Sequence, residues 1–503
     1  MTRPAGRVAP ASAEPAAEPQ ERWRLSGPGL VGLLGAGWVD GVGPLYEKLA
    51  IALQGAIEDG RLPTGGFLPA ERQLAEALFV SRGTVVAAYA ALRDRGLVAS
   101  RRGSGTRVSG RPAGTFSDEE TLAALARDPY LTGLIDERRA PIDLTVPAPR
   151  AALEHLAASG QLASLGVDLL KDATPLGYQP RGLVSLRRAL ARRLTAVGVP
   201  TGEDEVLVTN GGQQALSLLL ELFVRPNDEV VVENPSHRGL IDALLHRRAH
   251  VLPVALDDPH LPRRLDRLLA ERQPRLVLLT PTCHNPSGHV LDDDVRRELA
   301  RVVVRHGIPL VEDVVLADLA LDEPPPPIAA RVPADAPVIV VGSLSKVLWG
   351  GLRVGWLRAP SPLVSRVARL KAVADMGTSA VSQTIGLQLL AQLETSILRI
   401  QREEVRLALA TAEECLRVHL PDWRWRTPGG GRSLWARLPC GDATHFAQHA
   451  LLHGVAITSG ATLCFDGSGD RHVRLPFVQP PELLAEGCRR LGDAWNAYAQ
   501  SVA

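Results

Sequence analysis

The stretch Val341-Gly-Ser-Leu-Ser-Lys-Val-Leu-Trp-Gly-Gly-Leu-Arg-Val-Gly355 decides how the second half of the chain folds. An apolar run typical of a buried strand leads into Ser343 and Lys346, and Arg353 follows shortly after. A strand that ends here places a hydroxyl, an amine and a guanidinium close together, where they can surround a phosphorylated aldehyde. The combination is typical of a lysine that binds pyridoxal phosphate.

Further apolar runs, separated by helical segments, extend on both sides of this stretch from about residue 183 onward. Because these runs are continuously apolar, they predict a mostly parallel sheet that is covered by helices on both faces. The C-terminal part, with Gly429-Gly-Gly431 and Val473-Arg-Leu-Pro476, predicts a smaller α+β domain. The predicted strands are Val206–Thr209, Val230–Glu233, Leu276–Thr280, Leu310–Glu312 and Val338–Val341.

Composition narrows the class of protein but does not identify it. The chain has 503 residues, 45% of them hydrophobic, and 56 Lys and Arg against 55 Asp and Glu give a net charge of +1. Nucleic acid binding would therefore need a local basic patch. The five cysteines lack the spacing of a zinc site or a disulfide framework, so we predict no metal. With neither a signal peptide nor a long apolar run, a cytoplasmic protein is expected.

The chain divides into four predicted segments. Residues 1–26 are rich in Ala, Pro and Glu and predict a disordered tail. Residues 27–110 form a small domain, residues 111–140 a linker with Gly and Pro at its start, and residues 141–503 a large domain.

The helical spacing of apolar residues in the small domain predicts three helices, of which the second and third follow each other closely. The first helix covers Leu45 to Ile57, the second Leu68 to Leu78, and the third begins at Arg82, where Ser81 can cap it. A hairpin over residues 97–108 follows and forms a wing. The order predicts a winged helix-turn-helix.

Polar residues at the start of the third helix are available to read DNA. Ser81, Arg82 and Thr84 stand in its first turn, while apolar residues occupy the opposite face. Further cations that could contact phosphates are Arg72, Arg101, Arg102 and Arg107. The spacing alone also fits a small helical domain with a solvated arginine face.

Three motifs carry a resemblance over residues 44–108. Leu68-Pro-Ala-Glu-Arg-Gln-Leu-Ala75, Val80-Ser-Arg-Gly-Thr-Val85 and Gly103-Ser-Gly-Thr-Arg-Val108 resemble the winged helix-turn-helix of the GntR regulators. Gly83 and Val86 depart from the polar or basic residues of some members, so base preferences do not transfer. The resemblance implies DNA contacts from Arg72, Ser81, Arg82, Thr84, Gly103 and Gly105.

A possible cofactor site emerges from residues in the large domain. Gly211-Gly-Gln-Gln-Ala215 follows a strand and opens a helix, so the backbone N–H groups of Gly212 and Gln213 could hold a phosphate. Asn285 lies in a turn after a strand and could donate to a phenolic oxygen, and Asp313 could keep a pyridine nitrogen protonated. Taken singly, these are also an ordinary glycine turn, an Asn-Pro turn and a helix cap.

In sequence order, these elements resemble fold type I aminotransferases over residues 141–503, with Lys346 as the aldimine lysine. The resemblance implies that Ser343 and Arg353 bind the cofactor phosphate. It also implies that Tyr178 binds the phosphate in a neighbouring subunit, hence a homodimer. It further implies that Arg474 binds the carboxylate of an amino acid. The alternative is that Arg474 is a structural arginine on the surface.

Two positions depart from the aminotransferase pattern. His237 stands where an aromatic ring usually stacks on the cofactor, and Leu316 where a tyrosine usually binds the phenolic oxygen. Imidazole can still stack, but leucine cannot donate. The missing hydrogen bond to an ionised group is worth on the order of 1.5 to 3 kcal/mol. We therefore expect cofactor binding to survive and transamination to suffer.

The fusion of a GntR-type DNA-binding domain with an aminotransferase-like domain resembles the MocR subfamily of transcription regulators. The resemblance implies a regulator that depends on pyridoxal phosphate, binds a double-stranded DNA operator with two half-sites and senses an amine or amino acid through an aldimine on Lys346. Two alternatives stay open. One is an active aminotransferase with an accessory DNA-binding domain, and the other is a sensor of pyridoxal phosphate itself.

Overall fold

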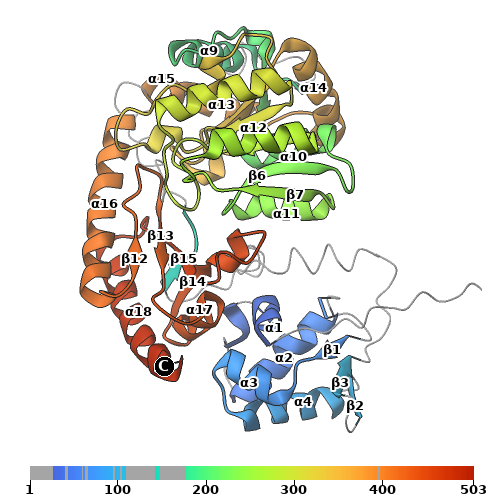
Figure 1. Cartoon of the computed structure of the whole chain (residues 1–503), viewed down its shortest axis with the longest axis vertical. Coiled ribbons are helices and arrows are strands. Elements are labelled where there is room, and N and C mark those ends of the chain that lie inside the picture. Colours follow the sequence, from blue (N-terminus) through green and yellow to red (C-terminus); the bar gives the residue numbers. More distant parts are fainter. Residues whose placement is uncertain are drawn as a thin grey trace, which may run out of the picture.

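A computed structural model of the chain describes residues 27–34, 36–39, 44–58, 61–62, 66–94, 97–101, 105–108, 142–147, 177–393 and 397–502. Figure 1 shows a small N-terminal domain (blue) beside a C-terminal domain (orange to red), with a larger α/β domain beyond the latter. The predicted tail, residues 1–26, and the predicted linker, residues 111–140, lie outside the described residues.

The N-terminal domain is the predicted winged helix-turn-helix. Its three strands form an antiparallel sheet in the order β1-β3-β2, and Tyr89 donates from its hydroxyl to the carbonyl of Pro69 at 2.9 Å inside the core. The second helix begins later than predicted, because Leu68 pairs with Thr106 in a short strand. A helix before the first predicted one was missed. The elements are α1 (Gly27–Leu34), η1 (Ala36–Val39), α2 (Leu45–Glu58), β1 (Phe67–Leu68), α3 (Glu71–Leu78), α4 (Arg82–Asp94), β2 (Val98–Arg101) and β3 (Gly105–Val108).

The large domain contains a seven-stranded sheet in the order β5-β11-β10-β9-β8-β6-β7 over the described residues. All five predicted strands are confirmed, and the sheet is parallel except for β11, which runs antiparallel to both its neighbours. The strands are β5 (Val206–Thr209), β6 (Glu229–Glu233), β7 (His250–Val254), β8 (Leu276–Leu279), β9 (Leu310–Asp313), β10 (Val338–Ser343) and β11 (Gly355–Arg358).

Helices cover both faces of this sheet, as its apolar strands predict. Successive residues of β5 point to opposite faces, so that Val206 and Val208 belong to one hydrophobic core and Leu207 to the other. The helices of this domain are α9 (Val184–Ala196), α10 (Gly212–Phe223), α11 (Arg238–His246), α12 (Leu261–Arg272), α13 (Asp293–His306), α14 (Ser361–Asp375) and α15 (Ala380–Gln392). Shorter helices are η3 (Glu203–Glu205), η4 (Ala317–Leu319), η5 (Ile328–Arg331) and η6 (Gly350–Leu352).

The C-terminal domain is α+β, as predicted, around a five-stranded sheet in the order β12-β13-β15-β14-β4. Its edge strand comes from residues 142–144, far away in sequence, and pairs in parallel with β14. The strands are β4 (Ile142–Leu144), β12 (Arg424–Trp425), β13 (Ser433–Arg437), β14 (Val455–Ser459) and β15 (His472–Pro476). The helices are α16 (Leu398–His419), α17 (Ala443–Leu452), η8 (Gly460–Leu463) and α18 (Pro481–Val502).

No single helix among the described residues is long and apolar enough to cross a membrane. One bent pair, Glu71–Leu78 with Arg82–Arg93, meets the criterion on length and composition alone.

Candidate functional site

The predicted cofactor residues meet at one edge of the seven-stranded sheet. The carboxyl ends of its parallel strands lie at this edge, and the antiparallel β11 begins there. The C-terminal domain contributes β15, whose Arg474 donates from Nη1 to Oδ1 of Asn285 at 3.5 Å. The residues that follow or end the strands here are Gly212, His237, Asn285, Asp313 and Ser343.

Lys346 is a half-buried amine with a depressed pKa. Burial, and after it the cations of Arg474, Arg353 and Arg432, lower the pKa of its ammonium from 10.5 to about 8, while Asp313 opposes them. A lysine that loses its proton this readily can attack an aldehyde near neutral pH. The influence of Asp313 and Arg474 on Lys346 also places both side chains within electrostatic range of the amine.

Asp313 ends β9 next to β10, where it pairs in register with Val341. The backbone N–H of Val315 donates to Oδ1 of Asp313 at 2.8 Å. Burial raises the pKa of this carboxyl to about 6, against the opposing effects of the Val315 hydrogen bond and of Lys346. The carboxylate is therefore mostly ionised at neutral pH and suited to pair with a protonated pyridine nitrogen.

The start of α10 forms a tight cradle of backbone. Gly211 has a φ of 82°, and a Cβ added there would lie 2.8 Å from Nη2 of Arg353. A Cβ on Gly212 would lie 2.9 Å from Cγ2 of Val315. Arg353 donates from Nη2 to the carbonyl of Asn210 at 2.7 Å. The positive end of α10 and the guanidinium of Arg353 thus lie close together.

Two serines in the decisive stretch differ in their hydrogen bonds. Ser343 donates from Oγ to the carbonyl of Val354 at 3.2 Å and accepts from the N–H of Ser345 at 3.1 Å. The hydroxyl of Ser345 is buried without a hydrogen-bond partner among the described residues. Ser345 is thus a site candidate that sequence reasoning missed, although it stands directly before the lysine.

Gln213 contributes its backbone rather than its side chain to this cradle. Its Nε2 donates to the carbonyl of Gly239 at 2.7 Å, across to the start of α11. The side chain therefore ties α10 to α11. This contact leaves the first-turn amide as the group of Gln213 that faces an anion.

His237 and Leu316, the two departures from the aminotransferase pattern, hold different positions. Nδ1 of His237 caps α11 by accepting from the N–H of Leu240 at 3.3 Å. Burial, then the cations of Lys346 and Arg474, lowers the pKa of His237 to about 4, so the ring is neutral and close to the site. Leu316 is half-buried and packs against the main core, and its side chain has no group that could form a hydrogen bond.

A buried polar network supports the loop that carries Asn285. The carboxyl of Glu233 accepts from the hydroxyl and from the N–H of Thr280, each at 2.6 Å, and burial raises the pKa of Glu233 to about 8. The ring of His284 lies 2.9 Å from the carbonyl oxygen of Pro235, and burial lowers the pKa of His284 to about 3. This network fixes the ends of β6 and β8 relative to each other.

A buried lysine, Lys371, lies beside the start of α10. Lys371 donates from Nζ to Oδ2 of Asp375 at 2.6 Å and to Oε1 of Gln214 at 3.0 Å. Asp375 also accepts from Nδ2 of Asn210 at 2.6 Å and from Nε2 of Gln214 at 2.7 Å. The ion pair counteracts the lowering of the Lys371 pKa by burial, which suits a structural support and not a second nucleophile. Sequence analysis missed this network.

Arg474 is buried, so the alternative of a surface arginine is wrong. It donates from Nη2 to the carbonyl of Thr145 at 2.8 Å and to Oγ1 of Thr458 at 3.3 Å. These contacts hold the guanidinium between the two domains, beside Asn285 and within electrostatic range of Lys346. A carboxylate that enters the site would find this cation already positioned.

Tyr178 lies on the surface of the single chain, where the residue is 66% exposed. Its segment packs on the end of α14, because a Cβ on Gly377 would lie 2.7 Å from the carbonyl oxygen of Gln179. Other exposed apolar side chains of this region are Val373, Met376 and Val381.

Of the predicted DNA-contacting residues of the helices, Arg72, Ser81 and Arg82 are exposed and Thr84 is half-buried. Ser81 caps α4, because its Oγ accepts from the N–H of Thr84 at 3.1 Å. Arg82 pairs with Glu71 at 3.3 Å and keeps 71% of its side chain exposed. Arg72, with 84% of its side chain exposed, pairs with Glu76 at 3.0 Å. These weak surface pairs leave both guanidinium groups accessible to a phosphate or a base.

The wing is described in part. Arg101 pairs with Gly105 across β2 and β3, and Gly105 has a φ of 86°, which glycine adopts readily. Arg107 lies on β3 with its guanidinium carbon 5.9 Å from the ring centre of Phe67. Arg102, Gly103 and the side chain of Arg101 lie outside the described residues.

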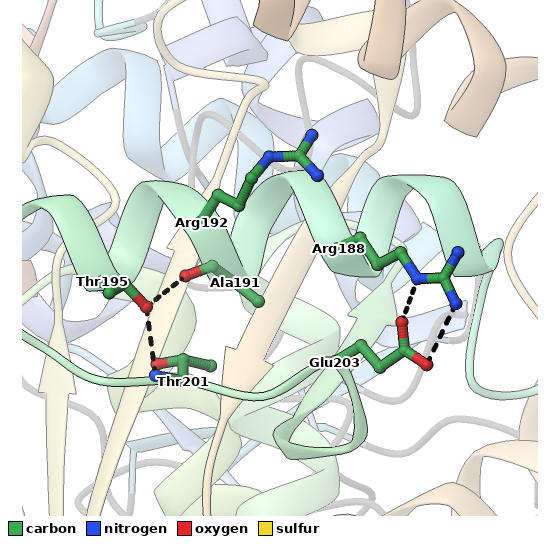
Figure 2. A pocket seen from close by; sticks show the side chains of 6 residues that line it. All are labelled: Arg188, Ala191, Arg192, Thr195, Thr201 and Glu203. Atoms are coloured by element: carbon green, nitrogen blue, oxygen red, sulfur yellow. Dashed lines mark hydrogen bonds and ion pairs between the residues drawn. The ribbon is translucent and has the colours of Figure 1, made fainter.

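The hollow in Figure 2 is separate from this site. It lies along α9 and η3, where Arg188 pairs with Glu203 and Thr195 donates from its hydroxyl to the carbonyl of Ala191 at 2.9 Å. Thr201 in turn donates from its N–H to the Thr195 hydroxyl at 3.2 Å. None of the predicted cofactor residues lines it.

Comparisons with known proteins connect both parts of the chain to families. The aminotransferase class I and II family matches residues 148–491, and the gntR family of bacterial regulatory proteins matches residues 45–108. YdfD of Bacillus subtilis, named an uncharacterized HTH-type transcriptional regulator, is 26% identical and aligns with 89% of this chain and 96% of its own. MocR of Rhizobium meliloti, named a probable rhizopine catabolism regulatory protein, is 27% identical, with coverages of 76% and 78%.

Among solved structures, LysN from Thermus thermophilus matches with a TM-score of 0.65 and 28% identity. The match covers 72% of this chain and 93% of that one. LysN is an alpha-aminoadipate aminotransferase, crystallised in complex with N-(5'-phosphopyridoxyl)-L-leucine.

Proposed function

This chain belongs to the aminotransferase class I and II family and, through its fused gntR domain, to the MocR-like regulators, and from that premise we propose that an amine or amino acid controls its DNA binding through Lys346. It is a fusion of a DNA-binding domain with an aminotransferase domain, and YdfD, which aligns with 89% of the chain, is named a transcriptional regulator. Pyridoxal phosphate is the cofactor that the family implies.

The residues at the sheet edge fit this cofactor. Lys346 supplies the amine, and Asp313 supplies the anion for a protonated pyridine nitrogen. The start of α10, together with Arg353 and the serine hydroxyls, suits the phosphate. Asn285 would donate from its amide to the phenolic oxygen. When bound, the cofactor supplies an electrophilic carbon and an electron-withdrawing ring.

The observation that carries the proposal is that the buried Arg474 lies within electrostatic range of Lys346, in a chain that also has an exposed helix suited to reading DNA. The guanidinium of Arg474 could bind the carboxylate of a ligand whose amino group reaches the site of Lys346, which suits an amino acid. Leu316 lacks the hydroxyl that would hold the phenolic oxygen. These features favour a ligand that is held at the site over one that is turned over rapidly.

Single-turnover spectra test this function. The folded chain is loaded with pyridoxal phosphate and mixed with individual L-amino acids, while the visible spectrum and any released keto acid are recorded. We expect a lasting spectral change with at least one amino acid and keto acid well below one equivalent per site. The same amino acid should change the affinity for operator DNA, because a ligand shifts a conformational equilibrium only by its differential affinity.

Two other functions remain distinguishable in this assay. Keto acid at one equivalent per site would identify an active aminotransferase with an accessory DNA-binding domain. A chain whose DNA affinity responds to pyridoxal phosphate, while no amine changes its spectrum, would be a sensor of the cofactor. In that case the buried Arg474 would have no carboxylate to bind.

A homodimer is part of the proposal. Tyr178 is exposed in a segment that packs at the end of α14, and Val373 of α14 is 90% exposed, so both leave large apolar side chains in contact with solvent. A second copy would bury them and bring Tyr178 toward the partner's cofactor phosphate. Two DNA-reading domains in one dimer predict an operator with two half-sites.

A further inference from the structure

The turn between α3 and α4 places a bulky side chain in an unfavourable backbone conformation. Phe79 has φ 53° and ψ 40°, in the left-handed region. A residue with a Cβ is strained there, whereas glycine adopts the conformation readily. Such strain persists only where the surroundings stabilise it, so the contacts of the Phe79 ring must offset it.

The ring of Phe79 packs outside its own domain. It lies against the core that contains Phe446 and Tyr498, whereas its neighbour Val80 packs against the core of the DNA-binding domain. Its ring centre is 5.2 Å from that of His449 and 5.4 Å from that of Tyr498, with nearly perpendicular planes. His445 completes the pocket around the ring at 6.0 Å.

A second contact joins the same two domains. Trp38 donates from Nε1 to Oε1 of Gln448 at 3.2 Å, and both side chains are buried. Gln448 lies between His445 and His449 on α17, so these three residues and Tyr498 of α18 form one surface, the docking face. Figure 1 shows α1 and α3 beside α17, in agreement with their contacts.

We propose that the docking face holds the DNA-binding domain of the same chain, with Phe79 as its anchor, and that this docking transmits the state of the cofactor site to the DNA-reading helix. Phe79 precedes Ser81, the cap of α4, by two residues. Any displacement of the ring therefore reorients the start of the recognition helix. This inference concerns regulation and rests on the function proposed above.

The docking face is connected to the cofactor site by one strand and one helix. Arg474 donates to Oγ1 of Thr458 on β14 at 3.3 Å. The next residue, Ser459, shares a hydrogen bond of 3.0 Å with the hydroxyl of Thr444 on α17. His445 follows directly. A carboxylate that displaces the Arg474 guanidinium would thus act on the helix that carries the anchor pocket.

Phe79→Gly in the full-length chain separates docking from folding of the DNA-binding domain. Glycine removes the ring and suits the left-handed turn, so the domain keeps its fold while the anchor is lost. Hydrogen exchange of residues 443–452 should accelerate by roughly tenfold or more, because an undocked face opens more easily. Ile51→Ala is the matched control, since Ile51 is 58% exposed on α2 of the same domain. Unchanged exchange in Phe79→Gly would overturn the docking.

Two further measurements sharpen the result. His449→Ala combined with Phe79→Gly should accelerate exchange no more than Phe79→Gly alone, because both changes remove one contact. If the effects of the two substitutions on the exchange rate were fully additive, the Phe79 ring would not contact His449. Trp38→Phe, which removes the hydrogen bond to Gln448 and keeps an aromatic ring, should give a smaller acceleration in the same residues. No acceleration in Trp38→Phe would remove Trp38 from the docking contact.

Pyridoxal phosphate is the probe for transmission. Its addition should change the exchange of residues 76–84 by about twofold or more in the wild type and not in Phe79→Gly. If the visible band of bound cofactor forms but exchange stays constant in the wild type, transmission is wrong. If no band forms, the proposed function fails instead, and the comparison without cofactor still decides whether the domain docks.

Discussion

Lys346 should react with pyridoxal phosphate at a rate that rises with pH, is half-maximal near pH 8 and levels off above it, because only the neutral amine attacks the aldehyde. The pKa of this amine falls from 10.5 to about 8, through burial first and then through nearby guanidinium groups, of which Arg474 has the largest effect. At pH 7 roughly one amine in ten is then neutral, against roughly one in three thousand for an ordinary lysine. The site thus multiplies the reactive amine by more than two orders of magnitude.

Two variants should move the midpoint of this pH profile in opposite directions. Arg474→Met removes a cation that disfavours the ammonium, so the pKa of Lys346 rises. Asp313→Asn removes the carboxylate that favours the ammonium, so the pKa falls. The assay is stopped-flow growth of the visible band between about pH 6 and pH 10. Lys48→Ala, in the DNA-binding domain, is the control. A wild-type midpoint near 10.5, or equal shifts in both variants, would refute the reasoning.

Three further predictions concern other parts of the chain. Leu316→Tyr should increase keto acid formation roughly tenfold or more, because it supplies the missing hydroxyl, and Leu316→Phe should not; equal effects would assign the gain to bulk. Arg82→Ala should weaken binding to an operator fragment by about 1 to 3 kcal/mol in a fluorescence titration, with Arg192→Ala, on α9, unchanged. Val373→Asp should raise the dissociation constant of the dimer in sedimentation equilibrium, because Val373 is 90% exposed on the apolar surface; an unchanged constant would place the interface elsewhere.

The sequence predicts the central strands of the large sheet because their residues are buried on both faces. β5 and β8 are apolar throughout, so composition alone identifies them. β7 and β11 were missed for physical reasons. The edge strand β7 contains His250 and Pro253, which a central strand rarely tolerates, and Arg358 of β11 is buried only because Glu205 pairs with it at 3.1 Å.

The candidate site shows a similar division. Lys346 and Asp313 follow strands within short motifs, so their approach to one edge follows from a parallel sheet. The contact of Lys371 with Gln214 at the start of α10 cannot be predicted in this way. The two residues are 157 positions apart, and their contact depends on how α14 packs on α10. The contact of Phe79 with His449 is likewise invisible in sequence, since it depends on the docking of two domains.

The most direct test of the account is the visible spectrum of the full-length chain with pyridoxal phosphate, recorded for the wild type and for Lys346→Ala. Circular dichroism verifies that both proteins are folded. The account predicts an absorption band of bound cofactor in the wild type, its loss in Lys346→Ala, and binding of operator DNA by the wild-type chain. A wild type that stays colourless, or a band that persists in Lys346→Ala, would contradict it.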